Sequence, residues 1–152
     1  MWAETTTRDR AAAPARARFP HGRIHTQIFQ SLTVSAVRRI VSQRAAAAGM
    51  DSQRRHDLVV AVSEVATNSV RHADGRGVLR VWQDGQVLVC EVADRGRPDR
   101  PLVGRTPPMP GQQGGYGLWI ANRLCDHVET LSTGSGTVIR LHMRLAAAPS
   151  PC

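Results

Sequence analysis

The chain has 152 residues and a formal net charge of +8, and all 20 of its basic residues are arginines. This length favours a single domain, and a chain of this size buries enough apolar surface to fold without disulfide bonds. The 3 cysteines are odd in number and far apart, which argues against a disulfide framework and indicates reduced thiols in a cytoplasmic protein.

The excess of arginine has two interpretations. A basic chain attracts polyanions such as nucleic acid, acidic proteins and nucleotide phosphates. All-arginine usage also follows from genome composition, and the chain contains no recognised nucleic-acid-binding motif. We therefore expect no direct binding of nucleic acid. We expect no membrane segment either, because no apolar stretch approaches the roughly 18 residues that a membrane span requires.

The first half of the chain predicts a tail followed by two helices. Residues 1–17 are rich in Thr, Arg, Ala and Pro and predict a disordered basic tail. Apolar residues recur at spacings of three and four over residues 31–48, which is typical of an amphipathic helix. Asp51 or Ser52 is expected to cap a second helix, which runs to about Ala73.

The second half predicts two β-hairpins separated by a loop and a third helix. Alternating and β-rich runs indicate four strands, at 78–82, 87–94, 128–132 and 137–145. A loop rich in Pro and Gly at 95–114 precedes an apolar helix at 117–126. Residues 146–152 are expected to form a short second tail, which leaves 18–145 as the folded domain.

The order of these elements predicts the fold class. Consecutive strands joined by tight turns imply a mixed, mostly antiparallel sheet. Helices with a single apolar stripe must hide that stripe, so they are expected to cover one face of the sheet. The prediction is a two-layer sandwich of the α/β (α+β) class.

Glu64, Asn68 and His72 lie four residues apart on the second predicted helix, so they share one face of it. They flank the apolar row, where a carboxylate and an amide would be partly buried. Burial of such groups costs free energy unless a partner compensates, and a metal ion with a bound nucleotide would do so. A solvated polar stripe explains the same spacing, and the pattern alone favours that simpler interpretation.

Asp94 and Gly96 end the second predicted strand. A carboxylate in this position can accept a hydrogen bond from an exocyclic amine, and a glycine two residues later lets the backbone approach a planar ring closely. Asp and Gly are also common turn residues, so the pair taken alone favours a plain turn.

Gly114, Gly115 and Gly117 precede Leu118 and the third predicted helix. A glycine-rich backbone running into a helix N-terminus presents free N–H groups and the positive end of the helix dipole, which favours phosphate. The segment is neither a Walker A loop nor a dinucleotide fingerprint. A flexible linker is the alternative interpretation.

The order of the motifs is more specific than any one of them. Glu64-xxx-Asn68, Asp94-x-Gly96, Gly115-x-Gly117 and Gly136-Thr137 resemble the four nucleotide-binding boxes of the GHKL ATPase superfamily, which has the Bergerat, or histidine-kinase-like ATPase, fold. The run from Ala61 to Asn68 is most similar to the anti-sigma-factor Ser/Thr kinases of bacterial partner-switching systems. The resemblance covers about residues 18–145.

The resemblance implies roles for individual residues. Glu64 would be the general base and Asn68 a Mg²⁺ ligand, while Asp94 would bind the adenine amino group with Gly96 beneath the ring. The remaining candidates around the nucleotide are Gly114, Gly115, Gly117 and Leu118 at the phosphates, Thr137 at the adenine end, and His72 as either a phosphate neighbour or a helix-capping residue. ATP and Mg²⁺ are the implied cofactors.

Two departures bear on phosphoryl transfer. Pro98 stands where many relatives have a further glycine. The chain has no lysine for the lid, so Arg97, Arg100 or Arg105 would have to contact the terminal phosphate, and Arg105 is included among the candidate site residues. The motifs therefore support nucleotide binding better than they support efficient transfer.

The resemblance implies an anti-sigma regulatory factor that phosphorylates a Ser or Thr of an anti-anti-sigma (STAS-type) partner, and that also sequesters a sigma factor. An ATP-gated binding module with little or no kinase activity is the alternative. A histidine-kinase catalytic domain would need a helical hairpin with a phospho-acceptor His, for which the N-terminal region is too short. Relatives are often dimers, so a homodimer is a further expectation.

Overall fold

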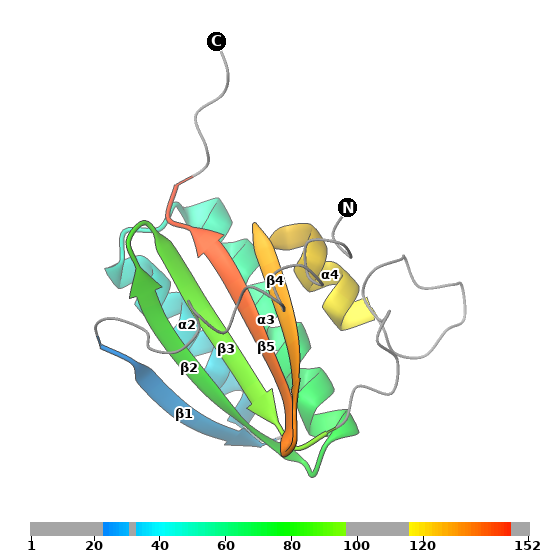
Figure 1. Cartoon of the computed structure of the whole chain (residues 1–152). Coiled ribbons are helices and arrows are strands. Elements are labelled where there is room, and N and C mark those ends of the chain that lie inside the picture. Colours follow the sequence, from blue (N-terminus) through cyan, green and yellow to red (C-terminus); the bar gives the residue numbers. More distant parts are fainter. Residues whose placement is uncertain (1–22, 31–32, 97–115, 147–152) are drawn as a thin grey trace.

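The structure is a computed structural model that describes residues 23–30, 33–96 and 116–146, without the side chains of His72 and Tyr116. The elements in chain order (Figure 1) are β1 (His25–Gln30), α2 (Val34–Ala47), α3 (Ser52–His72), β2 (Arg76–Asp84), β3 (Val87–Asp94), α4 (Tyr116–Leu124), β4 (His127–Thr133) and β5 (Gly136–Arg144). These strands form one sheet in the order β1-β2-β3-β5-β4, in which every neighbouring pair is antiparallel. The helices lie together on one face of this sheet (Figure 1).

The predicted two-layer sandwich with helices on one face is confirmed, and each predicted helix and strand is present with small shifts at its ends. β1 is a strand that the sequence pattern did not predict. Its two large apolar residues are adjacent, and Phe29 is buried whereas Ile28 is 59% exposed. The segment therefore lacks the alternation of apolar and polar residues that would predict a strand. The predicted tails at 1–17 and 146–152 lie outside the described residues, apart from Ala146.

The core lies between the helices and the sheet. The residues of α3 that face the sheet are at most 1% exposed, and they are Leu58, Ala61, Val62, Val65 and Ala66. The sheet meets them with the buried residues Leu79, Val81, Cys90, Val92, Val128, Leu141 and Met143. As expected, Cys90 and Cys125 are free thiols within this core, where burial raises the pKa of Cys90 to about 12. Among the described helices, none combines the length and apolar character of a membrane-spanning segment.

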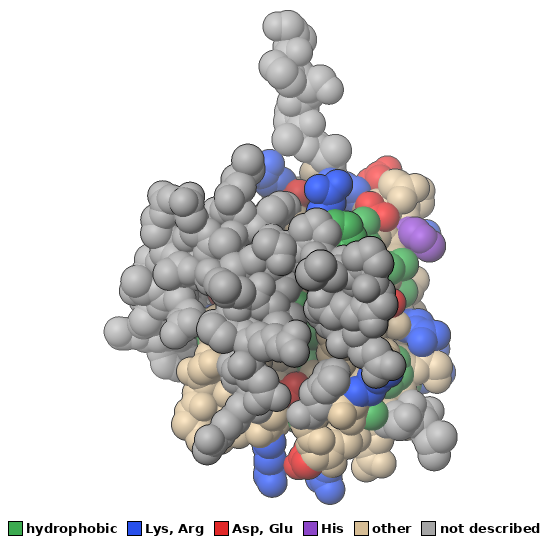
Figure 2. All heavy atoms as spheres, turned by 90° about the vertical axis from the view of Figure 1, so that its right-hand side faces the viewer, with side chains coloured by type: hydrophobic (Ala, Val, Ile, Leu, Met, Phe, Trp, Pro, Cys, Tyr) green, Lys and Arg blue, Asp and Glu red, His purple; other side chains and the backbone are tan. Residues whose placement is uncertain are grey.

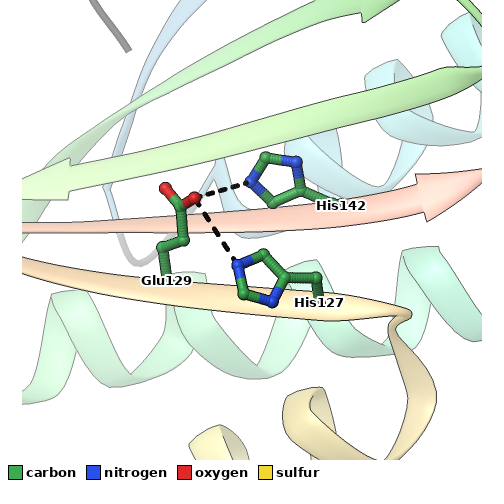
Figure 3. A group of neighbouring side chains, drawn as sticks. All are labelled: His127, Glu129 and His142. Carbon is green, nitrogen blue, oxygen red and sulfur yellow. Dashed lines mark ion pairs between the residues drawn. The ribbon is translucent and has the colours of Figure 1, made fainter. Parts of the chain in front are cut away.

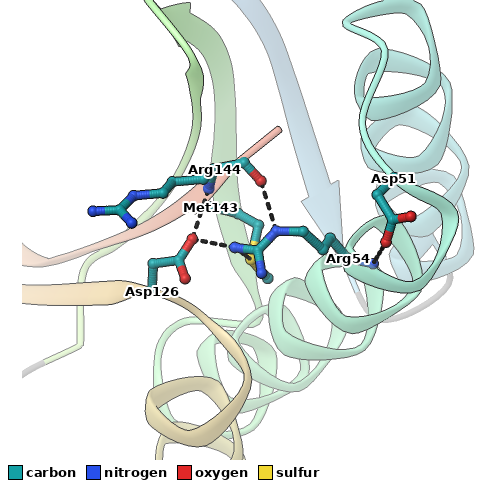
Figure 4. A network of polar contacts seen from close by, with 5 residues as sticks. All are labelled: Asp51, Arg54, Asp126, Met143 and Arg144. Atoms are coloured by element: carbon teal, nitrogen blue, oxygen red, sulfur yellow. Dashed lines mark hydrogen bonds and ion pairs between the residues drawn. The ribbon is translucent and has the colours of Figure 1, made fainter. Parts of the chain in front are cut away.

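Arg54 joins the start of α3 to the far strands of the sheet (Figure 4). Asp51 caps the helix by accepting a hydrogen bond from the Arg54 backbone N–H. The Arg54 guanidinium donates from Nε to the Arg144 carbonyl oxygen at 2.8 Å and pairs through Nη2 with the Asp126 carboxylate. Asp126 in turn accepts the Arg144 backbone N–H at 2.7 Å. One side chain therefore connects α3, the turn after α4 and the end of β5.

The face of the sheet without helices carries a row of alternating charges across four strands. The register pairs Arg80 of β2 with Glu91 of β3, Glu91 with Arg140 of β5, and Arg140 with Glu129 of β4. Arg80 and Arg140 each hold one oxygen of Glu91, at 2.9 and 2.8 Å, and Arg140 lies 4.0 Å from Glu129. We call these four residues the charge row.

A second row of side chains lies beside the charge row on the same face. It contains Trp82, Val89, His142 and His127, which are neighbours in the strand register. Trp82 is 8% exposed and lies 5.8 Å below the Arg140 guanidinium. Burial tends to raise the pKa of the Glu129 carboxyl, but the interactions with His127 and His142 outweigh it and lower this pKa to about 2. Glu129 is therefore a carboxylate throughout the neutral range.

Replacement of Arg54 by Ala is expected to destabilise the fold. It would leave the half-buried Asp126 carboxylate without its cation and the Arg144 carbonyl without its donor, which costs about 1–3 kcal/mol. Urea denaturation should show this loss in the free energy of unfolding. Arg39→Ala is the control, because Arg39 is exposed on α2 and makes no ion pair with another described residue, so it should change stability by less than about 0.5 kcal/mol. Equal stability of the two variants would contradict the anchoring role of Arg54.

Candidate nucleotide-binding site

Glu64 and Asn68 come from the middle of α3, and both are only partly exposed. The same helix buries Val65, Ala66 and Ser69 against the sheet, so its rotation places residues 64 and 68 at the border of the covered face. Neither the Glu64 carboxylate nor the Asn68 amide makes a hydrogen bond or ion pair with another side chain in the part of the chain that the structure describes. Within the described residues, both side chains therefore remain candidates for contact with a ligand.

Gly117 brings the start of α4 against these two residues. A Cβ atom at this position would lie 2.6 Å from Asn68 Nδ2 and 3.2 Å from the Glu64 carbonyl oxygen. A side chain at position 117 would therefore displace the Asn68 amide, and only glycine allows this approach. The structure thus brings together Glu64, Asn68 and Gly117, which belong to two different predicted motifs.

The N-terminus of α4 has the polarity that an anion requires. The first N–H groups of a helix have no partner within the helix, and the dipole adds partial positive charge there. The first turn of α4 contains no acidic residue that would oppose an anion. Leu118 is partly buried and packs against the core, so its side chain secures the helix, and only its backbone is left for a phosphate.

Asp94, Gly96 and Thr137 form a second group at the end of β3. The Gly96 N–H donates to Asp94 Oδ1 at 2.8 Å, and the Thr137 hydroxyl donates to the Gly96 carbonyl oxygen at 2.6 Å. Thr137 is the register partner of Asp94, and it is buried. Thr137 therefore acts on the Asp94–Gly96 turn directly, by fixing its backbone.

Gly136 makes that turn possible. A Cβ atom on Gly136 would lie only 1.9 Å from the Asp94 carbonyl oxygen, and its φ of +156° is one that side-chain-bearing residues rarely adopt. The two close approaches, at Gly117 and at Gly136, are the positions where the site depends on the absence of a side chain. The sequence marks Gly136 only as part of a short Gly-Thr pair, which does not reveal the contact with Asp94.

The second half of α3 and the end of β3 lie toward the same end of the sheet (Figure 1). In Figure 1, α3 runs toward the end of the sheet where β3 stops and where β4 turns into β5. Gly114, Gly115 and Arg105 lie outside the described residues, as does the side chain of His72. The predicted contributions of these four residues to the site stay predictions.

The described surface beside α4 does not carry a single large basic patch. Figure 2 shows Arg side chains at both the upper and the lower edge of this face, each group accompanied by acidic side chains. Basic and acidic side chains are therefore interspersed over the part of this face that the structure describes (Figure 2).

Comparisons with known proteins agree with this geometry. Residues 30–143 match the model of the family described as the histidine kinase-like ATPase domain. No curated protein matches the chain. Among solved structures, the RsbU and RsbW domains of Rv1364c from Mycobacterium tuberculosis match with a TM-score of 0.61 at 21% identity over 81% of this chain. This chain spans 32% of that protein's chain, and the likeness supports the fold alone.

A second solved structure is the histidine kinase AdeS of Acinetobacter baumannii, which is 12% identical, with 92% of this chain and 75% of that chain covered. Its TM-score of 0.46 is too low to carry an argument. The family model, by contrast, spans most of the chain and all of the described helices and most of the strands. The antiparallel sheet with helices on one face agrees with it, and this chain belongs to the histidine kinase-like ATPase domain family of the GHKL superfamily.

Proposed function

We propose that this chain is an ATP-dependent protein serine/threonine kinase that acts as an anti-sigma regulatory factor. Its substrate would be a Ser or Thr of an anti-anti-sigma (STAS-type) partner, and it would act in the cytoplasm. The observation that carries the proposal is the close approach of Gly117 to the Asn68 side-chain amide and to the backbone of Glu64, which brings the N-terminus of α4 against the part of α3 that bears both residues. Family membership and the fold likeness to a chain containing an RsbW domain support the same assignment.

The described residues suit ATP with Mg²⁺. Mg²⁺ takes oxygen ligands and keeps several waters, so it needs few protein groups beside phosphate oxygens. The amide oxygen of Asn68 would be its protein ligand, and α4 would direct N–H groups at the phosphates. Bound Mg²⁺–ATP would supply the phosphoryl group and neutralise its charge. Gly114, Gly115 and Arg105 are proposed to complete the phosphate contacts.

Glu64 is proposed as the general base. It lies one helical turn before Asn68, so its carboxylate would be next to the metal-bound phosphates and within reach of an incoming hydroxyl. A protein hydroxyl must lose its proton as it attacks phosphorus, and Glu64 would accept that proton. The other acidic residue of α3 is Asp57, two helical turns before Glu64.

The adenine end of the site is proposed to lie at the Asp94–Gly96 turn. Gly96 occupies one oxygen of Asp94, and the other oxygen would accept a hydrogen bond from the adenine amino group. The hydrogen bond from Thr137 and the glycine at 136 hold the turn in place before the nucleotide arrives. This preorganisation lowers the entropy cost of binding.

A specific observation favours a second function, an ATP-gated binding module that sequesters a sigma factor or other partner with little catalysis. The chain has no lysine, and Pro98 replaces the expected glycine after the Asp-x-Gly turn. Both features affect the lid, the segment that the family resemblance expects to close on the terminal phosphate. Nucleotide binding would persist in this case, whereas transfer would be weak.

Replacement of Glu64 by Gln tests the kinase. Labelled ATP, Mg²⁺ and a STAS-type protein would be incubated with each variant and the label on the STAS protein measured. Loss of the base is expected to lower transfer by about 10²-fold or more, while ATP affinity stays within about threefold. Asp57→Asn is the matched control, because Asp57 lies two turns earlier on the same face of α3. Undiminished transfer by Glu64→Gln would refute the base assignment, and ATP binding without transfer by wild type would favour the binding module.

Replacement of Gly117 by Ala tests the junction between α3 and α4. The new methyl group would push Asn68 aside, so ATP affinity measured by calorimetry should fall about tenfold or more. Gly134→Ala is the control, since a Cβ atom there would meet nothing within 4 Å, and it should bind ATP like wild type. In the double variant Asn68→Ala with Gly117→Ala the clash with the Asn68 amide disappears, and ATP affinity should nevertheless stay low because the Asn68 ligand is lost as well. Normal affinity in Gly117→Ala would show that the nucleotide binds elsewhere.

A further inference from the structure

His127, Glu129 and His142 converge on the face of the sheet that has no helices (Figure 3). His127 and Glu129 are two residues apart on β4, so their side chains leave the same face, opposite to the buried Val128. His142 of β5 is the register partner of His127, and its neighbours Leu141 and Met143 point into the core. Two imidazoles and one carboxylate are thus brought together by strand pairing.

The distances between their ligand atoms suit a bound metal ion. Oε1 of Glu129 lies 3.5 Å from Nε2 of His127 and 3.7 Å from Nε2 of His142. The three groups each offer one ligand atom, and these atoms all lie within 4.8 Å of one another. Zn²⁺ bonds of about 2.0–2.2 Å place the ligand atoms of a tetrahedral site roughly 3.3–3.6 Å apart. A small closure of the three side chains would produce that geometry.

The surrounding residues hold the carboxylate in position. Glu129 directs Oε1 to the imidazoles while its Oε2 lies 4.0 Å from Arg140 Nη1. Arg140 is in turn fixed by Glu91 at 2.8 Å, and Glu91 is bound to Arg80. Outer groups of this kind orient metal ligands in known sites. Glu91 also balances the positive charge that Arg140 brings close to a cation.

An ion pair between Glu129 and protonated histidines is the alternative explanation of the cluster. Both imidazoles face the same oxygen atom, and their ring centroids are only 5.2 Å apart, so two protonated rings would repel each other. The Nε2 atom of His142 is buried and lies 3.7 Å from Glu129 Oε1, which is beyond hydrogen-bond distance. A buried polar nitrogen without a close hydrogen bond is costly, and a metal bond would satisfy it.

We propose that His127, Glu129 and His142 form a three-ligand site for Zn²⁺ or a closely similar divalent transition metal. Two imidazoles and one carboxylate match the ligand preference of such ions, and a three-ligand zinc site leaves a coordination position for water or for a donor from a partner. The three side chains are between 14 and 25% exposed, although the His142 Nε2 atom itself is buried. The metal would tie the edge strand β4 to β5, on the opposite face of the sheet from α3 and α4.

Zn²⁺ binding to the chelator-treated full chain tests this proposal by calorimetry, with Co²⁺ absorption as a probe of coordination. We expect one Zn²⁺ per chain, an imidazole-type Co²⁺ spectrum, and no displacement by excess Mg²⁺, which prefers oxygen ligands. Glu129→Gln and His142→Gln should each weaken binding about tenfold or more. Zn²⁺ should also raise the melting temperature of wild type and leave that of the double variant unchanged.

Two control variants separate this site from adventitious binding. His56→Gln removes an exposed imidazole on α3, and Cys152→Ser removes the terminal thiol, so both should bind Zn²⁺ within about twofold of wild type. Circular dichroism and urea denaturation would establish that each variant is folded. If His142→Gln is not folded, the conservative Glu129→Gln variant provides the test. Absence of stoichiometric binding by wild type, or unchanged affinity in Glu129→Gln, would overturn the proposal. No nucleotide enters the measurement, so its failure is distinct from failure of the proposed kinase.

Discussion

The packing of α3 against the sheet is the constraint on which the rest of the structure depends. The helix buries one continuous apolar stripe that includes Leu58, Val62 and Val65. Removal of this surface from water fixes the rotation of the helix, because any turn about its axis would expose part of the stripe. The positions of Glu64 and Asn68 at the border of the covered face are a consequence of that rotation. The chemistry of the site is therefore set by residues that never touch a ligand.

The sequence was sufficient where a signal is local. Periodic apolar residues predicted the helices, alternation and a tight Asp-Gly turn predicted the central hairpin, and one apolar stripe per helix predicted the two layers. β1 escaped because its apolar residues are adjacent, with Ile28 facing outward, and because pairing with β2 supplies the stability that its own pattern lacks. The sequence of a six-residue segment does not by itself indicate that it will pair with another strand.

The candidate site was predictable in its members and only partly in its geometry. The spacing of Glu64 and Asn68 follows from helical periodicity, so their common face could be foreseen. The approach of Gly117 to Asn68 and of Gly136 to Asp94 joins segments far apart in the chain, and a glycine in a sequence does not state which backbone it lies against. The proximity of His127 and His142 could not be foreseen from their spacing in the sequence, because it arises only from the register of β4 and β5.

The two faces of the sheet divide the chemistry of the molecule. One face is covered by helices and supplies the core together with the groups proposed to hold a nucleotide. The other face bears the charge row and the histidines. Among the described residues, β5 connects the two faces directly, because it carries Thr137 near its start and His142 near its end.

The charge row has a further consequence for how the sheet assembles. Arg80, Glu91 and Arg140 match across three neighbouring strands only when each strand is aligned correctly with the next. A slip of one residue would turn Glu91 inward among aliphatic side chains, and a slip of two would set it opposite a nonpolar neighbour. Mispaired sheets are thus penalised by unmatched ionic groups while apolar contacts alone would tolerate some of them. The ionic pairs on the outward face therefore favour the strand register that the core on the inward face requires.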